Sequence, residues 1–175
     1  MTETMENTLN RQIELEAYAS FLYLSMASWC DNQGLAGCAQ FMHTQSSEER
    51  DHMLRIFHYI SEVDGHALTP SIPQAPVEFE SIQSMFYQVY EHEKKVTNAI
   101  NNIVDLCYKE NDYSTLNFMQ WYIEEQREEE DQMRTILDRI KLIGSGPQAL
   151  YYIDKEIAAI NKAELKAAAA EEEVA

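Results

Sequence analysis

The chain has 175 residues, of which 45% are hydrophobic, enough for one domain with a buried core. Its formal net charge of −17 makes nucleic acid and anionic membranes poor partners and cations natural ligands. No apolar run is long enough to cross a bilayer. The first residues lack a basic stretch followed by an apolar run, so we expect no signal peptide.

Helix-breaking residues are rare, with 5 Gly and 4 Pro in the whole chain, which favours long helices. In chain order, the patterns predict helices over residues 4–32, 35 or 38 to 64, 81–109 and 114–143. A shorter fifth helix follows, to about residue 162. We expect residues 1–162 to form one domain and the Ala- and Glu-rich residues 163–175 to be a frayed tail. The fold class is therefore all-α.

Apolar residues at steps near 3.6 mark the face of each helix that we expect in the core. These stripes are Leu9, Ile13, Ser20, Leu24 and Ala27; Phe41, Gln45, Ile56, Tyr59 and Val63; Ile82, Phe86, Val89, Val96, Ile100, Ile103 and Cys107; Phe118, Tyr122, Met133, Ile136 and Ile140; and Leu150, Ile153, Ile157 and Ile160.

Loop lengths predict the topology of the bundle. The first and third connections are short, so each joins an antiparallel pair of helices. The middle connection has about 15 residues and contains Pro70, Pro73 and Pro76; extended, it spans roughly 50 Å, whereas a helix of about 28 residues is ~42 Å long. This segment can therefore cross the whole length of the bundle. A loose surface loop between antiparallel helices is the alternative.

Polar residues interrupt each long stripe near the middle of its helix. They are Glu16 in the first helix, Glu49 and His52 in the second, Glu93 in the third, and Gln126 and Glu129 in the fourth. Packed side by side, the helices would bring these side chains together in an apolar core. Buried carboxylates need a partner, and no inward stripe contains Lys or Arg, so we expect a metal centre. Carboxylates with one imidazole suit iron or manganese, and also zinc.

With these residues in these positions, the chain resembles the ferritins, particularly the bacterial non-haem ferritins. The segments that carry the resemblance are Glu14-Leu15-Glu16-Ala17-Tyr18, Ser47-Glu48-Glu49-Arg50-Asp51-His52, Tyr90-Glu91-His92-Glu93, and residues Trp121 to Glu129. The resemblance implies a ferritin-like four-helix bundle with one long crossover and a short fifth helix. It also implies a homo-oligomeric shell of 24 subunits that stores iron mineral.

The resemblance further implies a di-iron centre that oxidises Fe(II) with oxygen or peroxide. Residue by residue, Glu16, Glu49 and His52 would hold one iron, and Glu49 would bridge to a second held by Glu93, with Gln126 and Glu129 close by. A third nearby iron site would use the family-matching residues Glu48, Glu125, Glu128 and Glu129. Tyr23 matches a family tyrosine beside the centre, where it would donate one electron; a plain core aromatic is the other interpretation.

Differences between this sequence and related di-iron families indicate which kind of ferritin it resembles. Bacterioferritins have Glu-x-x-His where Gln126-x-x-Glu129 stands, and their haem-binding Met would fall at Arg50, so we expect no haem. Cys30, Cys38 and Cys107 form no Cys-x-x-Cys pair, which disfavours a rubrerythrin-like or peroxidase-like di-iron redox enzyme with a rubredoxin-type donor. Three scattered thiols suit the cytoplasm. A DNA-protecting mini-ferritin and an inert bundle are the remaining alternatives.

Overall fold

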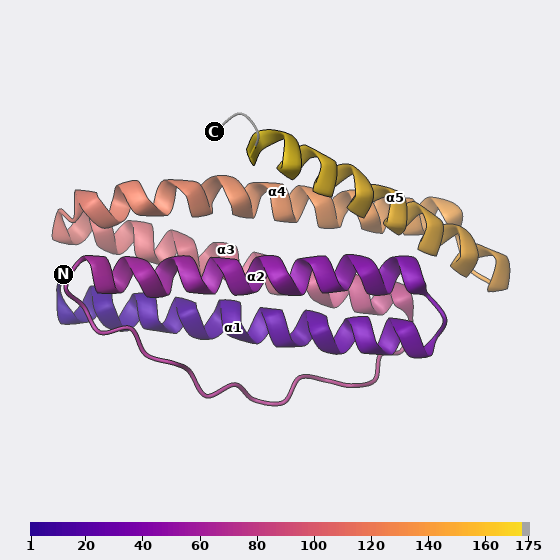
Figure 1. Cartoon of the computed structure of the whole chain (residues 1–175), viewed down its shortest axis with the longest axis horizontal. Coiled ribbons are helices and arrows are strands. Elements are labelled where there is room, and N and C mark those ends of the chain that lie inside the picture. The colour runs from indigo at the N-terminus through magenta and orange to yellow at the C-terminus, as the bar shows by residue number, and fades with distance from the viewer. Residues whose placement is uncertain (173–175) are drawn as a thin grey trace.

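The structure, a computed structural model, describes residues 1–172, with five helices and no strand in that range. The helices are α1 (Glu3–Asn32), α2 (Ala36–Glu62), α3 (Ile82–Glu110), α4 (Tyr113–Ile143) and α5 (Pro147–Glu172). Figure 1 shows α1 to α4 lying lengthwise in one bundle, with α5 set at an angle to it. The all-α, four-helix prediction is confirmed.

Local sequence signals set the helix ends. Side chains of Thr2, Ser81 and Asp112 cap α1, α3 and α4 by accepting a backbone N–H three residues on. The antiparallel turn between α3 and α4 passes through Asn111, whose φ of 57° is left-handed. After α2 ends, the left-handed residue is Asp64 (φ 62°), the last residue of the predicted helix, and the next N–H, of Gly65, donates to the Ile60 carbonyl.

The segment between α2 and α3 runs along the outside of α1 (Figure 1), which confirms the long crossover. Near one end of α1, the Leu68 N–H donates to Asn10 Oδ1 at 2.8 Å. Two turns before the other end, Ser25 Oγ donates to the Pro76 carbonyl at 2.6 Å. Phe79 then packs edge-on against Trp29. Because these contacts are spread along α1, the segment is held in an extended path instead of forming a loose loop.

The core divides into two apolar clusters, one towards each end of the bundle. One contains Tyr23, Phe41, Phe86 and Ile136, and the other contains Leu9, Ile56, Ile100 and Met119. Between them lies a layer of polar side chains, described below. The apolar stripes therefore stop and resume on either side of one level of the bundle.

Two predicted core residues are exposed. Leu24 is 45% exposed, whereas Tyr23 is fully buried, because consecutive helical residues point about 100° apart and α1 turns the Tyr23 side towards the bundle. Leu150 in the first turn of α5 is 41% exposed, and Ala149 is buried in its place.

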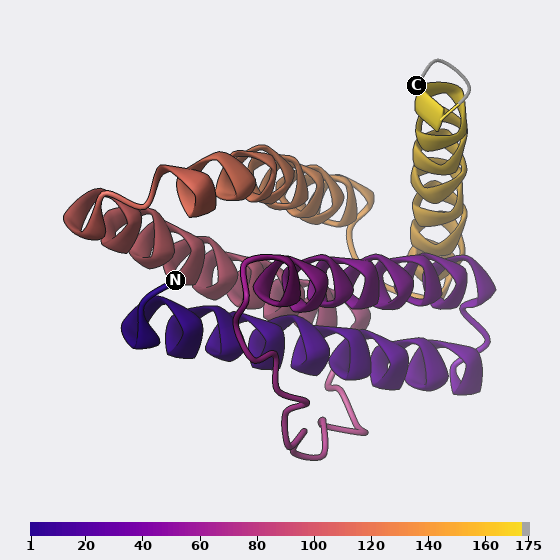
Figure 2. The same ribbon diagram turned by 60° about the vertical axis from the view of Figure 1, so that its left-hand side comes forward.

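Helix α5 stands away from the bundle at the end where α2 begins, as Figure 2 shows. Asp154 accepts a hydrogen bond from the Cys38 N–H at 2.9 Å, and a Cβ on Gly37 would overlap the Asp154 carbonyl oxygen. Because Gly37 lacks a side chain, the α5 backbone can approach α2 this closely. The helix continues to Glu172, past the end at residue 162 that we expected, and residues 173–175 of the expected tail lie outside the described range. Within residues 1–172, no helix has the length and apolarity required to span a membrane.

Candidate metal centre

Six polar residues from four helices form the layer between the two apolar clusters, which we call the central site. Each is at most 7% exposed. They are Glu16 of α1, Glu49 and His52 of α2, Glu93 of α3, and Gln126 and Glu129 of α4. Among the described residues no Lys or Arg side chain is buried, so no Lys or Arg lies within this layer to neutralise it. Four buried carboxylates without a cationic partner fit one or more hard metal ions.

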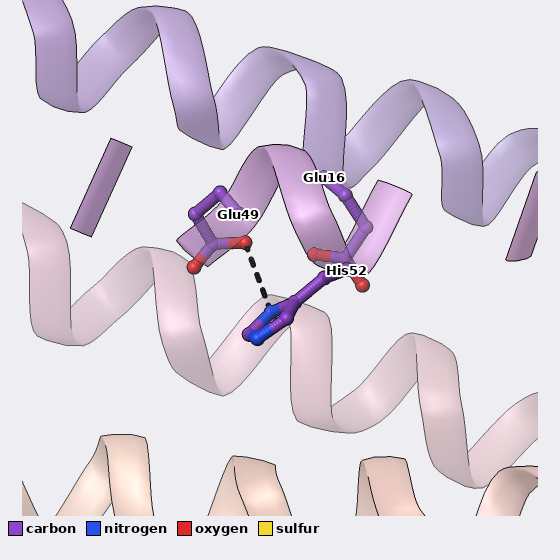
Figure 3. A group of neighbouring side chains, drawn as sticks. All are labelled: Glu16, Glu49 and His52. Atoms are coloured by element: carbon purple, nitrogen blue, oxygen red, sulfur yellow. Dashed lines mark ion pairs between the residues drawn. The ribbon is translucent and has the colours of Figure 1, made fainter. Parts of the chain in front are cut away.

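In one half of the central site, the side chains of Glu16, Glu49 and His52 already converge. One potential ligand atom each from Glu16, Glu49 and His52 lies within 4.8 Å of the others. The Glu49 carboxylate lies 3.7 Å from His52 Nδ1, one helical turn away on α2. Figure 3 shows the three side chains turned towards one another from α1 and α2. Two carboxylates and an imidazole in this arrangement can hold a metal ion with little rearrangement.

The other half is organised around Glu93. Tyr23 donates its hydroxyl hydrogen to Glu93 Oε1, and Gln126 Nε2 donates to Glu93 Oε2 at 2.7 Å and to the Glu93 carbonyl at 3.1 Å. The Gln126 amide oxygen is therefore the end of that side chain left to face a cation. Glu129 Oε2 is buried and accepts no hydrogen bond within the described chain.

Burial governs the protonation of these carboxyl groups. It raises the pKa of Glu93 to about 7, although hydrogen bonds from Tyr23 and Gln126 lower it. Burial and then the charges of Glu93 and Glu16 hold the pKa of Glu49 well above its usual range. Burial and the charges of Glu93 and Glu48 do the same to the pKa of Glu129. A bound cation would reverse this effect, because it stabilises the ionised form.

Tyr23 is fully buried, and burial followed by the charge of Glu93 raises the pKa of its phenol well above the usual value. The hydroxyl therefore stays protonated beside Glu93. The structure places Tyr23 in direct contact with the site, as a donor residue requires, and also within the apolar cluster, as a plain core aromatic requires.

The pattern of interrupted stripes did not mark Gln12 or His92, and it predicted Tyr122 only as a core residue; all three contact the site or Tyr23 beside it. Gln12 is buried one turn before Glu16 and donates to Glu16 Oε1 at 2.8 Å. Tyr122 donates to the His52 carbonyl at 2.7 Å and so ties α4 to α2. His92 is buried between the rings of Tyr18 and Tyr23, and burial lowers its pKa to about 4. The i, i+4 spacing of Gln12 and Glu16 was the available signal for the first of these.

The residues matching a third iron site border a separate space, a groove of about 770 Å³ between α4 and α5. Glu48, Glu125, Glu128 and Glu129 all line this outer groove. Glu128 is exposed and lies 3.8 Å from Arg127, whereas Gln45 donates to Glu48 at 2.6 Å. Burial and then the charges of Glu164 and Glu125 raise the pKa of Glu48 to about 7. Only Glu129 belongs to both the groove and the central site.

Comparison with known proteins agrees with this architecture. A family model described as a ferritin-like domain matches residues 6–143. A probable bacterial non-heme ferritin-like protein of Haemophilus influenzae is 40% identical over 90% of this chain and 95% of its own, and a bacterial non-heme ferritin of Campylobacter jejuni is 41% identical over 90% and 94%. An open-pore ferritin from Archaeoglobus fulgidus superimposes with a TM-score of 0.88 at 40% identity, covering 90% of this chain and 98% of that one. The chain belongs to the ferritin family and is of the bacterial non-haem type.

Proposed function

We propose that this protein oxidises Fe(II) at the central site and stores the resulting Fe(III) as mineral inside a hollow shell of 24 identical subunits. The observation that carries the proposal is the convergence of Glu16, Glu49 and His52 within 4.8 Å, in a layer that, among the described residues, contains no buried Lys or Arg. Membership of the ferritin family supports the storage role and the shell. The free, buried cysteines suit a protein of the reducing cytoplasm.

Each residue has a proposed part. Glu16, Glu49 and His52 bind one Fe(II), and Glu49 also reaches a second that Glu93 binds. Two Fe(II) ions supply the two electrons that reduce one O₂, taken up with two protons, to H₂O₂; peroxide can replace O₂ as oxidant. Gln126 and Glu129 complete the second position. Because Gln126 is neutral, it holds the product Fe(III) less firmly than a carboxylate would.

Two further roles lie at the edges of this centre. When only one Fe(II) is bound, Tyr23 can supply the second electron that reduces O₂ to H₂O₂, with its phenol proton passing to Glu93 Oε1, which it already contacts. Glu48, Glu125, Glu128 and Glu129 line the outer groove and form the third iron site through which product moves towards the shell interior. Haem has no part in this scheme, since Arg50 stands at the position of the bacterioferritin ligand.

The first test is aerobic loading of metal-free protein with Fe(II), well beyond a few ions per chain, followed by size-exclusion chromatography that records protein and iron together. The proposal requires iron to co-elute with one very large species. The same iron without protein is the control for precipitation. A small species that retains only about two irons per chain would instead identify a rubrerythrin-like or peroxidase-like redox enzyme, and storage would be ruled out.

A further inference from the structure

The fifth helix repeats a pattern found in the four bundle helices. Its buried face carries Ile153 and Ile157, both at most 2% exposed, and then Ile160, which is partly buried against the same cluster. The next residue at helical spacing is Glu164, followed by Ala167. An apolar stripe therefore ends in a carboxylate on the same face of the helix. That change occurs where α5 leaves the core and the outer groove begins, because Ile160, Glu164 and Ala167 all line the groove.

Glu164 is held in a defined position. Gln132 of α4 donates to Glu164 Oε1 at 2.5 Å. Glu48 of α2 and Glu129 of α4 line the same groove. Carboxylates from three different helices thus border one space, and the hydrogen-bond donor to the α5 carboxylate is a neutral amide.

The two arginines that also line the groove pair with carboxylates other than Glu48, Glu129 and Glu164. Arg127 lies 3.8 Å from Glu128, and Arg134 lies 2.9 Å from Asp131 and 3.6 Å from Glu130. Within the described part of the chain, no ion pair joins either arginine to Glu48, Glu129 or Glu164. Negative charge therefore predominates in the groove.

An independent feature indicates that this space receives a cation. Glu129 is 6% exposed, lines the groove, and has an Oε2 atom that is buried with no hydrogen-bond partner among the described residues. A buried carboxylate oxygen without a partner is costly, and neither neutral donors nor arginines supply one here. A hard metal ion between α4 and α5 would provide the missing partner.

We propose that Glu164 of α5 is a ligand, together with Glu48 and Glu129, of a metal cation held in the outer groove. This inference rests on the proposed function, because the cation is the iron that leaves the central site by way of Glu129, which borders both spaces. Hard oxygen ligands of this kind suit Fe(III) and its trivalent analogues. The fifth helix then takes a direct part in product release, in addition to its packing on α2.

Terbium(III) tests the site without any redox chemistry. Crystals of the assembled protein are soaked in a series of Tb(III) concentrations, and the occupancy of each anomalous peak is measured. We expect a peak between Glu164, Glu48 and Glu129, and at least a tenfold higher half-saturating concentration for that peak in Glu164→Gln. The matched control is Glu156→Gln on the same helix, where Glu156 lies 3.6 Å from Arg139 and does not line the groove.

A gain-of-function variant guards against a purely structural effect of losing Glu164. Ala167→Glu adds a carboxylate one turn further along the groove-facing side and should lower the half-saturating concentration. The proposal is overturned if Glu164→Gln binds Tb(III) in the groove like the parent, or if the groove peak lies away from Glu164.

Iron oxidation separates failure of this inference from failure of the proposed function. In Glu164→Gln the first two Fe(II) per chain should be oxidised at the parent rate, whereas a second dose, added shortly afterwards, should be oxidised severalfold more slowly. If the parent itself fails to oxidise the first dose, the proposed function is wrong. If the parent oxidises both doses and Glu164→Gln matches it in both, only the role of Glu164 is wrong.

Discussion

The central site and the outer groove are both built from glutamates, yet they differ in how the protein surrounds them. In the central site, ligand atoms of Glu16, Glu49 and His52 already lie within 4.8 Å of one another, and four helices enclose them. Among the side chains that the structure describes, no groove carboxylates converge this closely. The groove is wide, and one of its walls is the protruding helix α5. Enclosure favours tight, ordered binding of metal, whereas an open groove favours exchange.

Under the proposed function, this contrast in geometry suits the two regions to complementary tasks. A site that oxidises iron must bring two ions to fixed positions before an oxidant arrives, which requires preorganised ligands. A site that passes product onwards must release it, which requires ligands that remain partly hydrated and can move. Glu129 lies in both regions, so a change in metal binding in one region should affect metal binding in the other through this residue.

The largest expected effect is on the rate of iron oxidation, when a ligand of the central site is removed. We expect Glu16→Ala and His52→Ala each to slow oxidation of the first two Fe(II) per chain by about 100-fold or more, because a metal ion that loses a ligand is neither bound nor positioned for electron transfer. Stopped-flow absorbance in the near ultraviolet measures the rate. Glu14→Ala and His58→Ala are controls on exposed positions of the same helices. Parent-like rates in both ligand variants would show that the site is misassigned.

A smaller effect should appear in the stability of the metal-free protein. Burial raises the pKa of Glu93 from 4.5 to about 7, so between these values the native state keeps a proton that the unfolded chain has lost. The native state then binds more protons than the unfolded state, and the free energy of unfolding falls as the pH rises from about 4.5 to 7, by roughly 2 to 3 kcal/mol for Glu93 alone. Denaturant titrations of chelator-treated protein at pH 5 and pH 7.5 measure this difference.

The matched variant for that experiment is Glu93→Gln, which stays neutral at both pH values and should reduce the pH dependence by the contribution of Glu93. Stability that rises between pH 5 and 7.5 in the metal-free parent would contradict the expectation. Addition of Fe(II) under nitrogen or of Zn(II) should restore most of the lost stability at the higher pH, since the metal stabilises the ionised carboxylates.

The mildest change should affect the groove and leave the central site intact. Gly37→Ala places a methyl group against the Asp154 carbonyl and the Ala158 side chain, so α5 must shift, at a cost of about 1 to 3 kcal/mol. We expect a lower melting temperature and weaker Tb(III) binding in the groove, with the first-dose oxidation rate within twofold of the parent. Ala36→Ser, at the exposed neighbouring position, is the control. Loss of first-dose oxidation in Gly37→Ala would show that the two regions are not independent.

Several features were predictable because they depend on local or repeating patterns. Helix periodicity, sparse breakers and the proline-rich segment predicted four long helices and the crossover, and the observed ends lie within three residues of the expected ones. The interruptions of the apolar stripes pointed to six polar residues that the structure buries between the two apolar clusters, because a Glu, Gln or His in a buried stripe is conspicuous.

Other features depended on which faces meet, and periodicity does not report that. Leu24 and Tyr23 are neighbours in sequence with similar hydrophobicity, and only the packing of α1 against α2 and α3 decides that Tyr23 is buried and touches Glu93. His92 was visible only as a neighbour of Glu93, although it is buried between two tyrosine rings.

By itself, the sequence determined that this protein is a bundle of four long helices with a carboxylate-rich level at its middle, since both properties follow from the order of residues along each helix. Only the tertiary structure decided where α5 lies and therefore that Glu164 borders the outer groove. The reason is physical: an Ala- and Glu-rich helix such as residues 163–172 has no strong apolar stripe of its own. Its position follows from the preceding part of α5, where Ile153 and Ile157 pack in the core and Asp154 lies against Gly37 of α2.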